Sequence, residues 1–576
     1  MAELSADRVA RSGVTNGTGA AGTGHTDPFA RDNLPPPELW PALDTAVLEQ
    51  LGYAAQLNCA EELLDRNAAT DGSRTAFIHP DGRWSYDDLL QSANRIARVL
   101  VEDLGLEPGN RVLLRGPNNP MMAACWFAVL KAGGICVATM PLLRARELGY
   151  IVDKAQVSIA LTDVRFAAEL EQARTAGGRV AMRAAAGGAA GVGAGALHHV
   201  LYFNTDGAAG TLEHLMNTKS ADFDNVRTAA DDVAIIAFTS GTTGMAKGTM
   251  HFHRDILAVA DTFSRHIVNP QPDDIFCGSP PFAFTFGLGG LVLFPMRVGA
   301  AALLLEKAAP ASLLDGIRAH GATICFTAPT AYRAMLQSAA DEGIGRLHTC
   351  VSAGETLPRA TFDAWEKATG IRIIDGIGST EMLHIFISAA GDDIRPGATG
   401  RPVPGYVACV LDGEGREAPR GTVGRLAVRG PTGCRYLDDV ERQAAYVHDG
   451  WNITGDAYAQ DEDGYFWYQA RTDDMIISGG YNIAGPEVEN VLLDHEAVKE
   501  CAVIGLPDPE RGHVVTAFVV LNEDIPATTD TVTMLQDYVK AEIAPYKYPR
   551  QVRFVDELPR TETGKLQRYR LREAGA

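Results

Sequence analysis

The stretch from Phe238 to Gly248, FTSGTTGMAKG, decides the fold class of this chain. It follows an apolar run, Val233 to Ala237, which predicts a buried strand. Glycines at 241, 244 and 248 let backbone N–H groups converge, hydroxyl side chains donate further hydrogen bonds, and Lys247 supplies a positive charge. We therefore predict a polyphosphate-binding loop at the end of a strand. It is not a Walker P-loop, since that motif places Gly directly before Lys and here two residues separate Gly244 from Lys247.

Alternating strands and helices extend from this loop in both directions. Ser85 and Asp88 form a capping box before a helix, Arg111 to Leu114 predicts a buried strand, and Met121 to Ala132 predicts an apolar helix. Further strands are expected at 323–327 and 371–374. Short apolar strands separated by helices indicate parallel sheets covered on both faces. We therefore expect an α/β fold with a large N-terminal domain of parallel-type sheets flanked by helices.

Changes in composition predict the domain boundaries. Residues 1–37 are rich in Gly, Ala, Thr and Ser and end in three prolines, which is typical of a disordered leader. A second Gly/Ala patch, 184–196, predicts a loosely ordered surface loop. Beyond Arg471, short strands mix with helices at 486–494 and 531–543, which indicates a small α+β domain. We expect a leader at 1–37, an N-terminal domain at 38–472 and a mobile C-terminal domain at 473–576.

Composition and charge exclude several classes of protein. The 576 residues carry a net charge of −21, which argues against a nucleic-acid binder or a protein held on anionic lipid. Nine cysteines without a CxxC pair, and a charged N-terminus without an apolar h-region, predict a cytoplasmic protein with reduced thiols. The apolar run from Phe286 to Leu305 contains Pro295 and Arg297, so we expect a buried strand–turn–strand there and no membrane span.

Six motifs, in order, resemble those of the acyl-adenylate-forming superfamily of acyl-CoA synthetases, adenylation domains and luciferases. They are Trp84–Leu89, the 238–248 loop, Gly376–Glu381 (GIGSTE), Trp451–Asp456 (WNITGD), the hinge Arg471–Asp474 with its hairpin Gly479–Asn482, and Pro559–Lys565 (PRTETGK). The resemblance runs from about residue 55 to 570 and implies a small β-barrel-like part in the large domain. Ala246 replaces the family's proline, and Ile377 replaces the aromatic that flanks adenine.

The resemblance also implies roles for individual residues. Lys565, Glu381 and Thr239 are the expected catalytic residues, with Glu381 as the Mg²⁺ ligand. Asp375 is expected to accept from the adenine amino group, and Asp456 from the ribose hydroxyls. The expected ATP and AMP contacts are Thr239, Ser240, Gly241, Thr242, Thr243, Gly244, Lys247, Ala353, Gly354, Glu355, Asp375, Gly376, Ile377, Gly378, Ser379, Thr380, Asp456 and Arg471. Asp473 is the expected hinge, and Gly479, Gly480 and Tyr481 are expected to line a tunnel for coenzyme A.

The acyl pocket is expected around Pro281–Gly289 and Asp375–Phe386, which resemble benzoate- and aminobenzoate-CoA ligases. By position, Phe284 would gate the carboxylate, while the ring would lie against Thr285, Phe286, His384 and Ile385. This predicts a flat apolar slot suited to a benzene ring. Without the resemblance, the FxFxF pattern at 282–286 would favour a buried strand. The hydroxyl of Thr285, or else His384, is the expected partner of an ortho-amino group, so 2-aminobenzoate is the first candidate substrate and benzoate the second.

The sequence therefore predicts an AMP-forming aryl-CoA ligase that uses ATP, Mg²⁺ and coenzyme A. Two alternatives remain open: an adenylation enzyme that loads an aryl acid onto a carrier protein in trans, and an inactive nucleotide-binding protein. Retention of Lys247, Glu381, Asp456, Arg471 and Lys565 argues against the second. We expect no nucleic-acid or membrane partner, and a homodimer stays open. His251 and His253 lack a third ligand, so we interpret them as the end of a strand and not as a metal pair.

Overall fold

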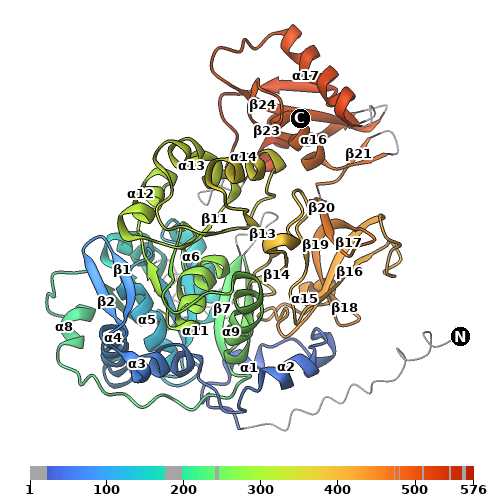
Figure 1. Ribbon diagram of the computed structural model, residues 1–576. Helices are drawn as coiled ribbons and strands as arrows, with labels where there is room; N and C mark the ends of the chain where they lie inside the picture. The colour runs from blue at the N-terminus through green and yellow to red at the C-terminus, as the bar shows by residue number, and fades with distance from the viewer. Residues whose placement is uncertain are drawn as a thin grey trace, which may run out of the picture.

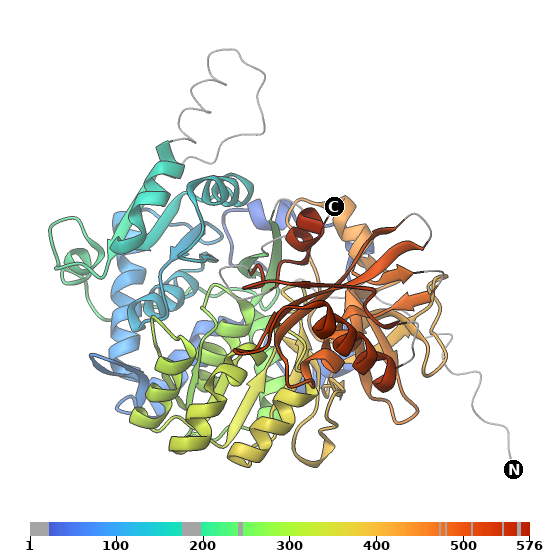
Figure 2. The ribbon, with the colours of Figure 1, turned by 90° about the horizontal axis from the view of Figure 1, so that it is seen from above.

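The computed structural model describes residues 22–175, 197–239, 246–471, 474–478, 481–508, 511–543, 547–560 and 566–575. A large N-terminal region and a small C-terminal domain, which begins after Arg471, are arranged one on the other (Figure 1). Figure 2 shows the C-terminal sheet and its helices lying across one end of the large region. The chain thus has the α/β architecture that the sequence predicts.

The larger of two parallel-type sheets in the N-terminal region has nine strands. Its central pairs from β1 to β13 are parallel, and its edge pairs are antiparallel. In spatial order it contains β15 (Arg401–Pro402), β14 (Ile385–Ser388), β13 (Ile374–Gly378), β12 (Thr349–Ser352), β11 (Ile324–Thr327), β9 (Ile275–Gly278), β10 (Ala301–Leu303), β1 (Thr75–His79) and β2 (Gly82–Ser85).

The second parallel-type sheet has six strands and carries the predicted phosphate loop at one edge. Its order is β6 (His199–Phe203), β5 (Ile159–Asp163), β3 (Arg111–Arg115), β4 (Ile135–Thr139), β7 (Val233–Thr239) and β8 (Lys247–Phe252). Only the β7–β8 pair is antiparallel, and the loop joins these two strands.

Two further sheets are mainly antiparallel. The five-stranded sheet of the large region occupies the place of the expected β-barrel-like part and contains β16 (Val407–Leu411), β17 (Val423–Arg429), β19 (Trp451–Gln460), β18 (Val447–His448) and β20 (Phe466–Arg471). The C-terminal sheet contains β22 (Tyr481–Ile483), β21 (Ile476–Ser478), β24 (Gly512–Leu521), β23 (Val498–Asp508) and β25 (Gln551–Phe554). Its two faces are covered by separate apolar clusters, one beneath α16 (Gly485–Leu493) and α17 (Thr529–Glu542) and the other beneath α18 (Arg568–Gly575).

Helices of the large region cover its sheets, and α12, α13 and α14 lie side by side (Figure 1). The α-helices are α1 (Phe29–Asp32), α2 (Thr45–Leu51), α3 (Arg66–Asp71), α4 (Tyr86–Arg98), α5 (Pro120–Lys131), α6 (Ala145–Ala155), α8 (Leu212–Met216), α9 (His253–Val259), α10 (Thr285–Leu288), α11 (Phe294–Val298), α12 (Pro310–His320), α13 (Pro329–Glu342), α14 (Arg359–Thr369) and α15 (Val440–Tyr446). Short 3-10 or π-helical segments are Pro37–Leu39, Glu61–Asp65, Val99–Asp103, Val164–Phe166, Ala260–Val268, Gly289–Leu293 and Gly391–Asp393.

The local signals in the sequence explain where several elements begin. The predicted capping box at Ser85 and Asp88 starts α4, with the two side chains each bonded to the other residue's backbone N–H. Asn119 caps α5, and Pro120 occupies its first position, where a missing N–H costs nothing. Since α5 is buried on nearly every side, its apolar composition has no amphipathic period.

Two predicted elements differ in the structure. The run from Phe286 to Leu305 is mostly helical, with α10, a π-helical turn and α11 before the short β10, so the prediction of strand–turn–strand was wrong. A continuous apolar run has no period that separates a buried helix from a buried strand. The strand expected at 371–374 begins only at Ile374.

Residues 22–34 are ordered against the large region, although 1–37 reads as a disordered leader. Thr23 Oγ1 and the Gly24 backbone N–H donate to the two carboxylate oxygens of Asp232, at 2.5 and 2.7 Å. Arg31 donates to the same carboxylate at 2.9 Å, and Asp27 pairs with Arg111. We call residues 22–34 the N-terminal strap. Composition misses it because its contacts are to specific distant side chains.

The C-terminal domain contacts the large region near the predicted adenine loop. Arg560 Nη1 lies 3.4 Å from Glu355 Oε1, and its Nη2 donates to Glu500 at 2.9 Å. Arg572 pairs with Asp474, which directly follows the predicted hinge. No helix in the described parts of the chain is long and apolar enough to cross a bilayer.

Candidate active site

The candidate site lies where the carboxyl ends of strands from both parallel-type sheets meet. Thr239 ends β7 and is paired across the ladder with Lys247, the first residue of β8. Ser240, Gly241, Thr242, Thr243 and Gly244, which join the two strands in the sequence, lie outside the described residues. The carboxyl edge of a parallel sheet is where α/β proteins bind nucleotides.

Two strands of the nine-stranded sheet end at the same place. Ala353, Gly354 and Glu355 follow β12 directly, and Asp375 to Gly378 form most of β13. Gly354 has φ +89°, a conformation that a side chain disfavours. Ser379, Thr380 and Glu381 continue beyond β13, so the predicted adenine and metal segments are adjacent in space as well as in sequence.

Asp375 lies at this edge as a half-buried residue whose Oδ1 atom is buried. Burial raises its pKa to about 7, and its Oδ1 has no hydrogen-bond partner among the described residues. Its backbone carbonyl accepts from the Ser388 hydroxyl at 2.5 Å, which fixes its position between β13 and β14. A buried carboxyl group with an unused oxygen can accept a hydrogen bond from a ligand amino group.

Glu381 is held by Tyr436, and the residue before it, Thr380, by His251 of β8. Tyr436 Oη donates to Glu381 Oε1 at 2.7 Å, and His251 Nε2 donates to the carbonyl of Thr380 at 2.7 Å. Burial lowers the pKa of His251 to about 4, so the ring is neutral near pH 7. Among the described residues the second oxygen of Glu381 makes no hydrogen bond and can bind a hard cation such as Mg²⁺.

Asp456 and Arg471 form the side of the site that lies on the five-stranded sheet. They face each other across β19 and β20, and Arg471 Nη1 donates to Asp456 Oδ1 at 3.2 Å. Burial raises the pKa of Asp456, while the Arg471 charge opposes the shift. Gly455 has φ +75°, and a Cβ there would lie 3.2 Å from Arg471 Nη2, so the turn before Asp456 needs glycine.

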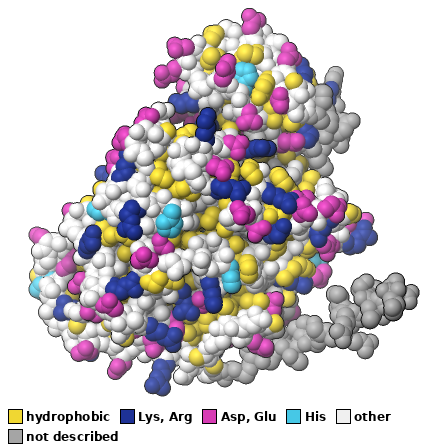
Figure 3. Space-filling view, in the orientation of Figure 1, with side chains coloured by type: hydrophobic (Ala, Val, Ile, Leu, Met, Phe, Trp, Pro, Cys, Tyr) yellow, Lys and Arg dark blue, Asp and Glu magenta, His cyan; other side chains and the backbone are white. Residues whose placement is uncertain are grey.

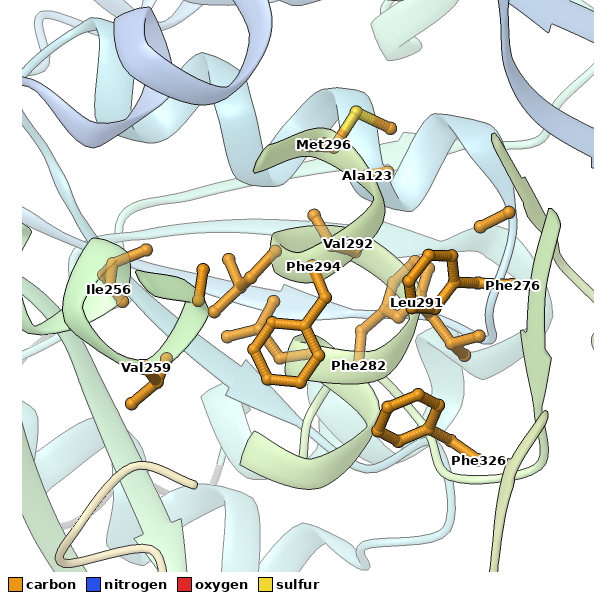
Figure 4. Close-up of a cluster of buried hydrophobic side chains, with 14 of the residues drawn as sticks. Ala123, Ile256, Val259, Phe276, Phe282, Leu291, Val292, Phe294, Met296 and Phe326 are labelled. Carbon is orange, nitrogen blue, oxygen red and sulfur yellow. The ribbon is translucent and has the colours of Figure 1, made fainter. Parts of the chain in front are cut away.

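The predicted acyl pocket divides into two neighbourhoods. His384 lies within an aromatic cluster, with ring centroids 4.6 Å from Phe294, 5.7 Å from Phe286 and 6.5 Å from Phe326. Figure 4 shows Phe294 and Phe326 among other buried apolar side chains. Thr285 instead lines a small cavity with Trp126, Cys136, Phe282 and Leu288. The structure therefore brings Phe286 to His384 but places Thr285 in a separate hollow.

His384 is a buried histidine whose ring lies near the Phe286 backbone. It is 3 % exposed, and neither ring nitrogen has a partner among the described residues. Burial lowers its pKa to about 3, so the imidazole is neutral and offers one donor and one acceptor. Phe284 precedes α10 as its N-cap, and Ile385 begins β14 beside Gly376. An unpaired buried polar ring is costly unless a ligand satisfies it.

Several predicted residues cannot be placed. Lys565, Asp473, Gly479 and Gly480 lie outside the described residues, and only the backbone of Tyr481, in β22, is described. Arg560, five positions before Lys565, contacts Glu355, so the C-terminal segment approaches the adenine loop. Sequence reasoning missed Tyr436, Arg560 and the contact of His251, because only the distant pairing of strands reveals them. The interpretation of His251 and His253 as a strand end is confirmed, since β8 ends at Phe252 and α9 begins at His253.

The structure brings Lys247, Glu381, Asp456 and Arg471 to one end of the two parallel-type sheets, with the aromatic cluster around His384 following Glu381 in the chain. The chain belongs to the AMP-binding enzyme family: the family model matches residues 64–435, and the AMP-binding enzyme C-terminal domain matches 487–565. Among curated relatives, the benzoate–CoA ligase of Thauera aromatica is 35% identical over 90% of this chain and 96% of its own. The 3-hydroxybenzoate–CoA ligase of Aromatoleum sp. (strain CIB) is 30% identical over 89% and 94%.

Solved structures agree with the fold over nearly the same span. The anthranilate CoA ligase AuaEII, solved with anthranoyl-AMP, superposes with a TM-score of 0.83 at 32% identity and covers 91% of this chain and 98% of its own. A benzoate CoA ligase from Burkholderia xenovorans LB400 gives 0.80 at 30% identity, covering 90% and 100%.

Proposed function

We propose that this protein is an AMP-forming aryl-CoA ligase, an acid–thiol ligase that activates an aromatic carboxylate with ATP. The observation that carries the proposal is the position of the aromatic cluster. His384 follows Glu381 by three residues, so the aromatic pocket begins where the phosphate and metal residues end. The relatives are named as ligases of coenzyme A and aromatic acids, which supports the same assignment.

The chemistry divides into two half-reactions. In the first, a carboxylate oxygen attacks the α-phosphorus of ATP, the bond to the bridging oxygen breaks, and pyrophosphate leaves with its electron pair. Lys247 and the Thr239–Gly248 loop would hold the phosphates, and Lys565 would offset charge at the α-phosphate. In the second, the thiolate of coenzyme A attacks the acyl carbon and AMP leaves. The thiol proton passes to solvent.

Mg²⁺ bound with ATP supplies charge neutralisation at the phosphates. Its proposed ligand is Glu381, because Tyr436 occupies one carboxylate oxygen and the other is open among the described residues. Asp456 would accept from the ribose hydroxyls, with Arg471 beside it, and Asp375 from the adenine amino group. Turning of the small domain about Asp473 would then exchange Lys565 for the hairpin at 479–481.

The proposed substrate is 2-aminobenzoate, with benzoate as the second candidate. The two unpaired nitrogens of His384 are the polar groups of an otherwise apolar aromatic cluster, and an amino group on the ring can satisfy one of them. Thr285 remains the alternative partner from its neighbouring cavity. The structural relative solved with anthranoyl-AMP favours the amino-substituted acid.

A hydroxamate-trapping screen over benzoate, aminobenzoates, hydroxybenzoates and medium-chain acids tests the substrate. We expect the highest kcat/KM for 2-aminobenzoate. His384→Phe should reduce the preference over benzoate by about tenfold, the effect of one hydrogen bond of about 1.4 kcal/mol. Thr285→Val tests the alternative partner: a loss of the preference in this variant and not in His384→Phe would assign the amino group to Thr285. Turnover of benzoate at an equal or higher kcat/KM would contradict the proposal.

The acceptor is separately testable. Incubation of the enzyme with the aryl acid, ATP and either coenzyme A or a holo-carrier protein distinguishes the two acceptors by product mass. We expect only the CoA thioester, since the curated relatives are named as CoA ligases. The domain limits 38–472 and 473–576 and a cytoplasmic location stay predictions. Nine buried, unpaired cysteines are consistent with the latter.

A further inference from the structure

The strand that follows the phosphate loop is tied to a segment far along the chain, residues 433–437. The Met250 backbone N–H donates to the carbonyl of Arg435, and that of Leu437 donates to the carbonyl of Gly248, both at 2.8 Å. Thr249 bridges Tyr436 between these bonds. The backbone at Tyr436 is therefore fixed directly against β8.

Arg435 anchors this segment in the interior. Its fully buried guanidinium lies 3.2 Å from Asp255 and 4.1 Å from the centre of the Phe252 ring, so it cannot shift without leaving a buried charge unpaired. Because Tyr436 is the next residue, its position is set by the packing of β8 and α9.

The Tyr436 side chain contacts two charged residues of the site. Its ring lies 5.5 Å from Lys247 Nζ, within range of a cation–π contact, and its hydroxyl donates to Glu381 at 2.7 Å. In the described parts of the chain, Lys247 and Glu381 form no ion pair with one another. Without the Tyr436 side chain, the positive charge of Lys247 and the negative charge of Glu381 would favour a direct ion pair. Such a pair would take up the carboxylate oxygen that is proposed to bind the metal ion.

We propose that Tyr436 is a positioning residue that keeps Glu381 directed at the metal and separate from Lys247. This rests on the proposed role of Glu381 as the Mg²⁺ ligand. The hydroxyl satisfies one carboxylate oxygen and leaves the other for the cation. His251 holds the preceding carbonyl from the same strand that carries Lys247, so the phosphate-binding and metal-binding groups share one rigid support.

Nucleotide binding measured by calorimetry tests the proposal without turnover. A non-hydrolysable ATP analogue is titrated into wild type, Tyr436→Phe and Tyr446→Phe, once with Mg²⁺ and once with EDTA. Tyr446 is the matched control, because its ring centroid lies 5.8 Å from that of Tyr436. In the described structure the Tyr446 hydroxyl donates no hydrogen bond to Glu381. We expect Tyr436→Phe to weaken binding about tenfold with Mg²⁺ and to match wild type in EDTA, since a hydrogen bond to a charged group is lost.

Two further variants separate the outcomes. Glu381→Gln should remove the Mg²⁺ dependence, and adding Tyr436→Phe to it should change nothing further. If Glu381→Gln keeps the dependence, the proposed metal ligand is wrong. If Glu381→Gln loses it while Tyr436→Phe behaves as wild type, only the role of Tyr436 is wrong. Equal weakening with Mg²⁺ and with EDTA would mark Tyr436 as structural, and melting curves verify that each variant is folded.

Discussion

Gly289 lies against the His384 ring, and Gly289→Ala tests this contact. An added methyl carbon would lie 2.4 Å from His384 Cδ2, 2.6 Å from its Nε2 and 3.0 Å from Phe294 Cζ. Both rings are buried, at 3 % and 0 % exposure, so neither can move into solvent. Overpacking of this kind costs about 1–3 kcal/mol.

Thermal melting and steady-state kinetics read out the effect. With an unfolding entropy of about 2 cal/mol/K per residue, a loss of this size lowers the Tm of so large a domain by about 1–3 °C. We expect kcat/KM for the aromatic acid to fall about tenfold, because His384 is pushed within its cluster, while KM for ATP stays unchanged. The control is Gly149→Ala in α6, where a methyl group meets nothing within 4 Å and should stabilise the helix slightly.

The reasoning is refuted if Gly289→Ala keeps both the wild-type Tm and the wild-type kcat/KM. A fall in Tm with unchanged specificity would show that His384 packs there without touching the substrate. The two readouts thus separate the packing argument from the assignment of the pocket.

Three other perturbations follow from buried or interdomain charges. Arg435→Met removes the closest cation from the buried Asp255 carboxylate and leaves it only Arg254 Nε, at 3.9 Å, so urea denaturation should show a loss of up to about 3–5 kcal/mol; a loss below about 1 kcal/mol contradicts the pairing. Asp375 has a folded pKa of about 7, above its ordinary value of 3.8, so the native state keeps its proton longer and this group lowers stability as pH rises from about 4 to 7. Asp375→Asn should therefore raise Tm relative to wild type more at pH 8 than at pH 5, and an equal shift at both would refute the burial argument. Arg560→Ala removes a partly exposed contact to Glu355, so Tm should change little. In Arg560→Ala, the rate of ATP–pyrophosphate exchange should fall, while the rate of thioester formation from supplied acyl-AMP should stay at the wild-type value. Equal slowing of both reactions would contradict a role of Arg560 in the first half-reaction alone.

Much of the site could be predicted because its residues follow strand ends in a fixed order. Thr239 and Asp375 lie within strands and Glu381 lies three residues beyond one, and the strands of parallel sheets end at a common edge. Ordered motifs therefore imply proximity even without coordinates. Strand β8 runs antiparallel to β7 and places Lys247 opposite Thr239, so these two residues of one motif are indeed close in space.

The rest depended on packing that one sequence does not encode locally. The run from Phe286 to Leu305 is apolar throughout, so only its neighbours decide between helix and strand, and helical turns bring Phe286 and Phe294 to His384. Tyr436 lies 55 positions from Glu381, and no local pattern marks the pair. Acidic and basic side chains are interspersed on the face drawn in Figure 3, so net charge says little about where anions bind.

The N-terminal strap bears on how this chain can be shortened. The family match begins at residue 64, which makes that position an obvious place to trim. Trimming there would remove three groups that bind the Asp232 carboxylate, and also Asp27, which pairs with Arg111. Asp232 precedes β7 by one residue. In a shortened chain the Ala229 backbone N–H would still donate to this carboxylate, but its cation and its two other donors would be gone, directly before the strand that leads into the phosphate loop. A weakened nucleotide affinity of such a chain could then be mistaken for a catalytic defect.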